Sequence, residues 1–215
     1  MKTISQNKPN FQISEKPYWK LLLQSIMLFV LFSIVYIFIS ANEDHLSALL
    51  TGTLLVIGIF LLGKWLNIQF FTFEKFTKEQ VMIVILSVVI CQAMYYLFTL
   101  PISTTSNQQD INSVLAGLPF INKLLSTAIL SPIIEEVVFR GLLIKGLFRG
   151  IPIIGAVLSV ILFGAAHIPT NIWEWLIYGG YGFVFVTAYL KTKRLEVPMI
   201  IHILHNSLFL IIYHV

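Results

Sequence analysis

The sequence predicts an all-α membrane protein, a polytopic bundle of about seven transmembrane helices, with six to eight as the range. Of its 215 residues, 57% are apolar before the 12 glycines are counted, whereas soluble domains have roughly 45–50% with glycine included. Charged residues make up 11%, less than half of the roughly 25% that is usual. The mean hydropathy of +0.87 agrees. This composition excludes a soluble enzyme and a disordered chain, and the single cysteine, Cys91, excludes a disulfide scaffold.

Seven apolar stretches approach the roughly 20 residues that a helix needs to cross the hydrocarbon core. They are Leu21–Ser40, Leu46–Leu62, Val81–Leu100, Leu124–Ile144, Ile151–Ala166, Trp173–Leu190 and Val197–Tyr213. Two segments are expected at the membrane interface: Lys64–Gln80, which mixes aromatic rings with charges, and the short Ile111–Phe120, which Pro119 interrupts. We therefore expect a cytoplasmic tail at 1–20, membrane helices and interfacial segments at 21–120, and a catalytic core at 121–215.

The lysines and arginines predict the orientation, because cytoplasmic loops carry an excess of them. Twelve of the 14 lie at one end of the predicted bundle: Lys2, Lys8, Lys16, Lys20, Lys64, Lys75, Lys78, Lys145, Arg149, Lys191, Lys193 and Arg194. The loops at the other end, 41–45, 101–110 and 168–172, contain none. We expect a cytoplasmic N-terminus. The net charge of +4 then reflects topology, so the expected partner is the lipid bilayer and not nucleic acid. The Ile-, Phe- and Lys-rich composition favours a bacterial plasma membrane.

Three charged residues stand inside an apolar run, at Glu135, Glu136 and Arg140. Each opposes insertion by roughly 2.5–3.5 kcal/mol at the centre of a span, and such residues usually mark a functional site. Glu136 and Arg140 are four residues apart with the acid first, the favoured order for an ion pair. We interpret that pair as structural. Glu135 lies on another face without a local counter-charge, which makes it the candidate catalytic carboxylate.

Histidines extend this pattern to two of the last three predicted spans. His167 ends one of them, and His202 and Asn206 are four residues apart in the last span, so they share a helix face. A lone histidine in a span is often a satisfied interhelical hydrogen-bonding group. Several such residues beside an unpaired carboxylate are harder to explain by packing. Glu135 could take a proton from water, His167 could share that water and protonate a leaving amine, and His202 and Asn206 could stabilise an oxyanion.

These residues form three motifs that resemble the CAAX protease and bacteriocin-processing family of intramembrane peptidases, also called the Abi family. The motifs are Glu135-Glu136-Val-Val-Phe-Arg140, Phe163-Gly-Ala-Ala-His167 and His202-Ile-Leu-His-Asn206, in this order across roughly the last 90 residues. The resemblance implies a helical membrane fold and proteolysis near the membrane, with Glu135, His167, His202 and Asn206 at the catalytic centre. It also implies a membrane-associated peptide or protein substrate and links to bacteriocin processing or immunity.

Two alternatives stay open. Glu135, His167 and His202 would make a two-histidine, one-carboxylate zinc set, as in a CAAX-type metalloprotease. That set would lack its general base, because Glu136 is expected to pair with Arg140, so we expect hydrolysis without a metal or another cofactor. The second alternative is a transporter or proton relay, since intramembrane Glu and His residues also serve ion paths.

The depth of the predicted site is a further expectation. Counting 1.5 Å per helical residue from Lys145 and Arg194 places Glu135 and His202 in the cytoplasmic half, with a chamber that faces the cytoplasm. The same count from Arg149 places His167 too far out to join them. Gly150, Pro152 and Gly155 suggest that its helix starts late or enters at a slant.

Overall fold

The computed structural model describes residues 11–212, and within them every regular element is helical. Each of the seven predicted stretches coincides with a helix. The helices are α1 (Tyr18–Ser40), α2 (Leu46–Trp65), α3 (Lys78–Thr99), a continuous helix over 120–147, α7 (Pro152–Ala166), α8 (Ile172–Thr192) and α9 (Glu196–Ile212). The first ten residues of the predicted tail, and Tyr213, lie outside the described residues. The prediction of a helical membrane bundle is confirmed; the division into three regions stays a prediction.

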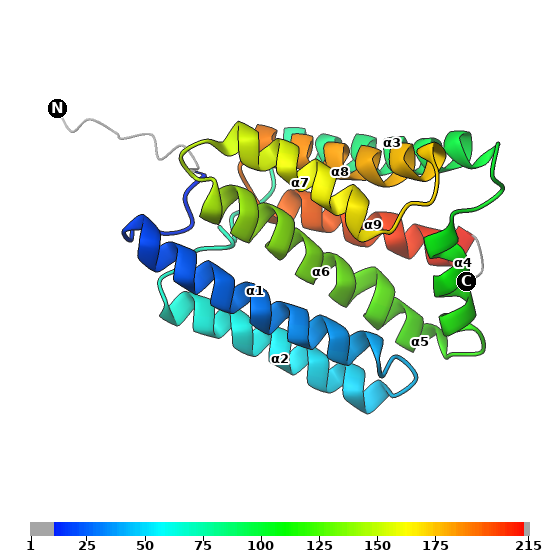
Figure 1. The fold of residues 1–215 in the computed structure, drawn as a ribbon, viewed down its shortest axis with the longest axis horizontal. Helices are drawn as coiled ribbons and strands as arrows, with labels where there is room; N and C mark the ends of the chain where they lie inside the picture. Colours follow the sequence, from blue (N-terminus) through cyan, green and yellow to red (C-terminus); the bar gives the residue numbers. More distant parts are fainter. Residues whose placement is uncertain (1–10, 213–215) are drawn as a thin grey trace.

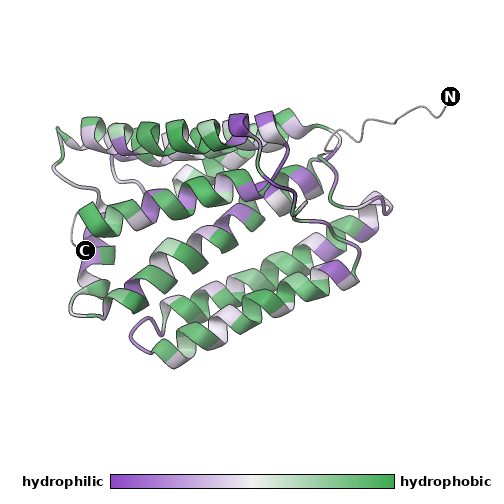
Figure 2. Ribbon diagram, turned by 180° about the vertical axis from the view of Figure 1, so that it is seen from behind, coloured by the Kyte–Doolittle hydropathy of each residue, from purple (hydrophilic) through white to green (hydrophobic). Residues whose placement is uncertain are grey.

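Three helices, α1, α2 and α3, have both the length and the hydropathy of a membrane span, with mean hydropathies of 2.5, 2.3 and 2.3. Helices α7 and α9 are apolar but shorter. The remaining long helices carry polar groups: charged side chains between 135 and 145 in one, and Glu174 in α8. The number of spans and the cytoplasmic N-terminus therefore stay predictions. Hydrophilic residues gather at the end of the bundle near the N-terminus, whereas apolar residues dominate the helix middles (Figure 2).

The continuous helix over 120–147 divides the bundle (Figure 1). It consists of α5 (Phe120–Lys123), η1 (Leu124–Leu130), α6 (Ser131–Glu136) and η2 (Val137–Leu147), where η1 and η2 have π-helical hydrogen bonding. Pro132 has no N–H to donate to the preceding turn, which favours a departure from regular α-helix there. Helices α1 and α2 pack together on one side, and α7, α8, α3 and α9 pack on the other. Its middle therefore faces two groups of helices.

The two predicted interfacial segments differ in structure. Residues 66–77 form no helix, and Thr77 starts α3 with a capping box to Gln80. The second segment is the helix α4 (Ser106–Leu115), which begins five residues before the predicted Ile111. It starts early because the Thr105 side chain accepts a hydrogen bond from the Gln108 N–H, a strong N-cap that hydropathy does not reveal.

Helix α7 explains how His167 reaches the other site residues. It starts at Pro152, a residue suited to the first turn of a helix, and it spans only 15 residues, about 22 Å. Ile168 turns into the left-handed region with a φ of 49°, and Pro169 cannot continue the helix. The end of α7 therefore lies well inside the length of the bundle (Figure 1). The helix begins one residue after the predicted Ile151, so it does not start late, and His167 sits at the C-terminal end of this short helix.

Glu174 connects α4 to the loop between α7 and α8, and we predict a structural effect of removing it. Its side chain is 2% exposed and accepts hydrogen bonds from the backbone N–H and hydroxyl groups of Ser106 and Thr170. Glu174→Leu should lower the free energy of unfolding by about 2–3 kcal/mol, because hydrogen bonds to charged groups contribute roughly 1.5–3 kcal/mol each. Thermal denaturation in detergent measures this. Asp110→Leu, on the exposed surface of α4, is the control. Equal losses in both variants would contradict a stabilising role of the hydrogen bonds to Glu174.

Candidate active site

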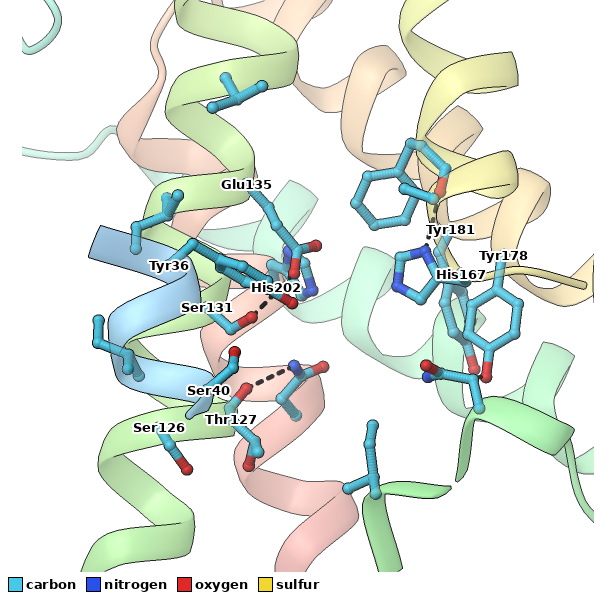
Figure 3. Close-up of a pocket in the computed structure, with 18 of the residues that line it drawn as sticks. Tyr36, Ser40, Ser126, Thr127, Ser131, Glu135, His167, Tyr178, Tyr181 and His202 are labelled. Carbon is cyan, nitrogen blue, oxygen red and sulfur yellow. Dashed lines mark hydrogen bonds between the residues drawn. The ribbon is translucent and has the colours of Figure 1, made fainter. Parts of the chain in front are cut away.

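A cavity of about 480 Å³ lies between α1, α6, α8 and α9 and holds every predicted catalytic residue. Polar groups line it among aromatic rings (Figure 3). They include Tyr36, Glu43, Asn107, Gln108, Thr127, Ser131, Glu135, His167, Tyr178, Tyr181, His202, His205 and Asn206. Glu135, His167, His202 and Asn206 come from three separate motifs, and the fold brings them to one space.

Glu135 points into the cavity from α6. Its Oε1 accepts a hydrogen bond of 2.9 Å from the Ser131 hydroxyl, one helical turn earlier. Its Oε2 is buried and has no hydrogen-bond partner among residues 11–212. A buried carboxylate oxygen without a partner is costly unless a water or a ligand group completes it. Ser131 is not among the predicted site residues, although its position four residues before Glu135 was a usable signal.

Glu136 and Arg140 form the predicted ion pair, with 2.9 Å between Arg140 Nη1 and Glu136 Oε1. Both side chains are completely buried. Arg140 also donates a 3.2 Å hydrogen bond to the carbonyl of Gly182, and its guanidinium carbon lies 4.7 Å from the ring centre of Phe163. The sequence did not indicate that the same Oε1 lies 3.1 Å from His202 Nδ1. Glu136 thus joins the arginine to the candidate catalytic histidine.

The tautomer of His202 follows from this contact. The carboxylate of Glu136 pairs with Arg140 and can only accept, so Nδ1 of His202 carries the proton and donates it. Phe185 stacks on the imidazole at 4.6 Å, which restrains the ring. Nε2 is then an acceptor in the neutral ring and a donor only in the imidazolium form.

His167 faces Glu135 and His202 from the other side of the cavity (Figure 3). Its Nδ1 lies 2.8 Å from the carbonyl oxygen of Phe163, which can only accept, so Nδ1 again carries the proton. Tyr178 stacks on the ring at 4.3 Å. The backbone and the tyrosine hold the imidazole so that the lone pair of Nε2 is free to receive a proton from water.

Asn206 completes the predicted set and also connects two helices. Its side-chain amide donates a 2.9 Å hydrogen bond to the carbonyl of Thr127 in η1. The same amide has a second N–H. His205, one turn from His202, is also buried and lines the cavity, with its ring 4.5 Å from that of Tyr181. The sequence placed His205 near this face of α9, but only the packing of α8 brings Tyr181 beside it.

The zinc alternative requires Glu135, His167 and His202 to converge on one point. Within residues 11–212, no group of three His, Cys, Asp or Glu side chains is arranged to hold a metal ion. Nδ1 of His167 and Nδ1 of His202 are both engaged in hydrogen bonds. Nε2 of each ring stays available, as in metal-bound histidines, whose other ring nitrogen usually donates to an acceptor; independence from a metal therefore stays a prediction.

The direction of the cavity differs from the expectation. A chamber that faces the cytoplasm would be lined by residues near the basic end of the bundle. The lining runs instead from Glu135 toward Ser40, Glu43 and Gln108, at the end that holds the loops without basic residues. The expectation used only the distance to the nearest basic residue and not which end the packing leaves open; the side of the membrane that this end faces stays a prediction.

Comparisons with known proteins agree with the motifs. Residues 117–208 match the family model described as "Type II CAAX prenyl endopeptidase Rce1-like". This range contains all three motifs. No solved structure matches the chain. The match to the family model confirms the resemblance drawn from the motifs and leaves the first 116 residues without a family assignment.

Three curated bacterial proteins are similar to this chain. Over 94 residues it is 38% identical to the "Membrane-embedded CAAX protease MroQ" of Staphylococcus aureus (strain USA300), covering 40% of this chain and 36% of that protein. It is 30% identical over 114 residues to the "Putative membrane peptidase YdiL" of Bacillus subtilis (strain 168), covering 53% and 45%. It is 28% identical over 109 residues to the "UPF0177 protein YvdC" of Lactococcus lactis subsp. lactis (strain IL1403), covering 51% and 41%. The matches thus span less than half the length of each relative.

Proposed function

We propose that this chain, whose residues 117–208 match the family model of Rce1-like CAAX prenyl endopeptidases, is a membrane-embedded endopeptidase of the CAAX protease and bacteriocin-processing family. One observation carries the proposal: the unpartnered Oε2 of Glu135 shares a closed-in cavity with His167, His202 and Asn206. A carboxylate, two imidazoles and an amide are sufficient for general acid–base hydrolysis of a peptide bond. The substrate is a membrane-associated peptide or protein, because the cavity also reaches lipid-facing side chains such as Ile37.

In the proposed reaction, Glu135 and His167 hold a water molecule between them. Oε2 of Glu135 takes the proton as the water oxygen attacks the carbonyl carbon of the peptide bond. The tautomer fixed by the Phe163 carbonyl gives His167 an acceptor nitrogen for the second hydrogen of the water. His167 then passes this second proton to the amide nitrogen as the C–N bond breaks, so that a carboxylate and an amine are released.

The negative charge on the former carbonyl oxygen needs hydrogen-bond donors. The second N–H of the Asn206 amide is one donor. His202 is the other only as an imidazolium, because its Nδ1–H already donates to Glu136 and the neutral ring has no second N–H to offer. Glu136 therefore acts through His202 as a positioning residue, which adds to the structural role that the sequence assigned to it.

An assay of the purified protein distinguishes this proposal from the transport alternative. Protein in detergent, without any membrane gradient, should cleave a fluorogenic peptide or a protein substrate, whereas a proton relay should not. Because the natural substrate is unknown, a library of peptides read by mass spectrometry is the suitable probe. Absence of cleavage by a folded protein across the library, together with proton flux in liposomes, would favour the relay.

We predict that the cleavage does not depend on a metal. Peptidase activity should survive prolonged treatment with a strong chelator, because the candidate ligands do not converge and a zinc set that includes Glu135 would lack a general base. Elemental analysis of the purified protein should find well under one zinc per chain. Loss of activity on chelation that added zinc restores would contradict this prediction and make Glu135 a ligand.

A further inference from the structure

The open end of the cavity lies among the loops that carry few basic residues. Beyond Glu135, the lining continues to Ser40 at the end of α1, Glu43 in the following turn and Gln108 in α4. It also includes Leu210 near the end of α9. These residues gather at the same end of the bundle, where α9 ends (Figure 1).

The opposite end is sealed by chain segments held on basic side chains. Lys145 Nζ donates to the carbonyl of Gln69 at 2.9 Å, and Arg149 donates to the carbonyls of Ser14 and Lys16 at 2.7 and 2.9 Å. Arg194 donates to the carbonyl of Glu74 at 2.7 Å. These bonds hold segments 14–16 and 66–77 across the helix ends.

Apolar side chains fill the space beneath those segments. Ile13, Ile68 and Phe70 are at most 3% exposed and belong to the core that α1, α2 and the long helix share. A side chain added at Gly141 would come within 3.1 Å of the Phe70 ring, so the packing leaves no passage there. In the described part of the chain, no residue of 11–20, 64–78 or 145–152 lines the cavity.

The sealed end is also the basic end. In the described residues it carries Lys16, Lys20, Lys64, Lys75, Lys78, Lys145, Arg149, Lys191, Lys193 and Arg194, whereas Lys123 stands at the open end. Since an excess of lysine and arginine marks the cytoplasmic side of a membrane protein, the predicted orientation puts the sealed end at the cytoplasm and the open end at the outer face.

We propose that the catalytic cavity is closed to the cytoplasm and opens at the outer face of the membrane, so that its substrates are peptide segments presented on that face. The statement about substrates rests on the proposed function, whereas the direction of access is a property of the cavity alone. Such substrates would be exported peptides, or membrane proteins with a segment exposed outside.

The test is the reactivity of single cysteines in intact cells. They are introduced in a Cys91→Ala background, so that the buried native thiol does not contribute to the signal. Ser131→Cys, a near-isosteric change beside Glu135, probes the depth of the cavity, and Ser40→Cys probes its mouth. Asp44→Cys reports the outer loop and Lys191→Cys the basic end, both at exposed positions. The probe is a small, membrane-impermeant, cationic thiosulfonate, applied to intact cells and to inverted vesicles.

We expect Ser131→Cys and Ser40→Cys to react from outside, at rates within about tenfold of Asp44→Cys, because access and thiolate fraction set the rate. Lys191→Cys should react only in inverted vesicles. Reaction of Ser131→Cys only in inverted vesicles, or from neither side in a variant that accumulates normally, would overturn the proposal. So would reaction of Asp44→Cys only from the cytoplasmic side.

The outcome is independent of whether the chain is a peptidase, because labelling needs no substrate. Where the purified protein does cleave peptides, a bulky impermeant maleimide attached to Ser40→Cys from outside should reduce cleavage at least about tenfold by blocking the mouth. The same reagent on Lys191→Cys is the matched control. Full activity after complete modification of Ser40→Cys would overturn the entry route and leave the proposed peptidase function intact.

Discussion

Glu135→Gln is expected to lower the turnover of peptide hydrolysis by at least about 10³-fold, since a positioned general base contributes roughly 10²–10⁴-fold. The amide keeps the shape of the carboxylate and can still accept the 2.9 Å hydrogen bond from Ser131. It cannot take a proton from water. The protein should therefore insert and accumulate normally, with an unchanged thermal midpoint in detergent, so that the loss is one of chemistry.

Two further variants make this test specific. Asp110→Asn, an exposed acid on α4, should keep full activity. Ser131→Ala should lower activity by a much smaller factor than Glu135→Gln, because the hydroxyl only holds Oε1 while Oε2 faces the cavity. Full activity of Glu135→Gln, or the same loss in Asp110→Asn, would remove Glu135 from the role of base.

The positions of the helices could be predicted from the sequence because apolar length alone determines where a membrane helix fits. The short span of α7 could be suspected from Pro152, since proline favours the first turn of a helix. The early start of α4 could not, because it depends on the capping hydrogen bond from Thr105. Hydropathy reports the polarity of side chains and not the geometry of a single helix N-cap.

The members of the site could be predicted because charged and polar residues are too costly inside a bilayer to be incidental. Their partners could not. The i,i+4 rule finds Arg140 for Glu136, but the 3.1 Å contact with His202 joins residues 66 positions apart and depends on how α9 packs against α6. The open side of the cavity depends in the same way on segments 14–16 and 66–77, which carry no motif.

The second large effect is expected on stability, at the buried pair of Glu136 and Arg140. Arg140→Leu leaves the Glu136 carboxylate in a fully buried site, and breaking such a pair usually costs about 3–5 kcal/mol. The structure adds that His202 still donates to Oε1 of Glu136 after this change. Glu136→Leu should be at least as damaging, because the guanidinium that it leaves behind cannot be deprotonated and keeps only the Gly182 carbonyl and its aromatic neighbours.

The double variant Glu136→Leu/Arg140→Leu decides whether the loss comes from an unpaired charge. It should be more stable than either single variant, since replacing both members of a buried pair by apolar residues is often neutral or stabilising. The midpoint of thermal unfolding in detergent measures all three, and the exposed pair of His45 and Asp44 supplies the control, in which Asp44→Leu should change little. The double variant should still hydrolyse peptides poorly, because His202 has lost its only carboxylate partner in the described residues. A double variant no more stable than the worse single variant would show that Arg140 is held by packing and not by its charge.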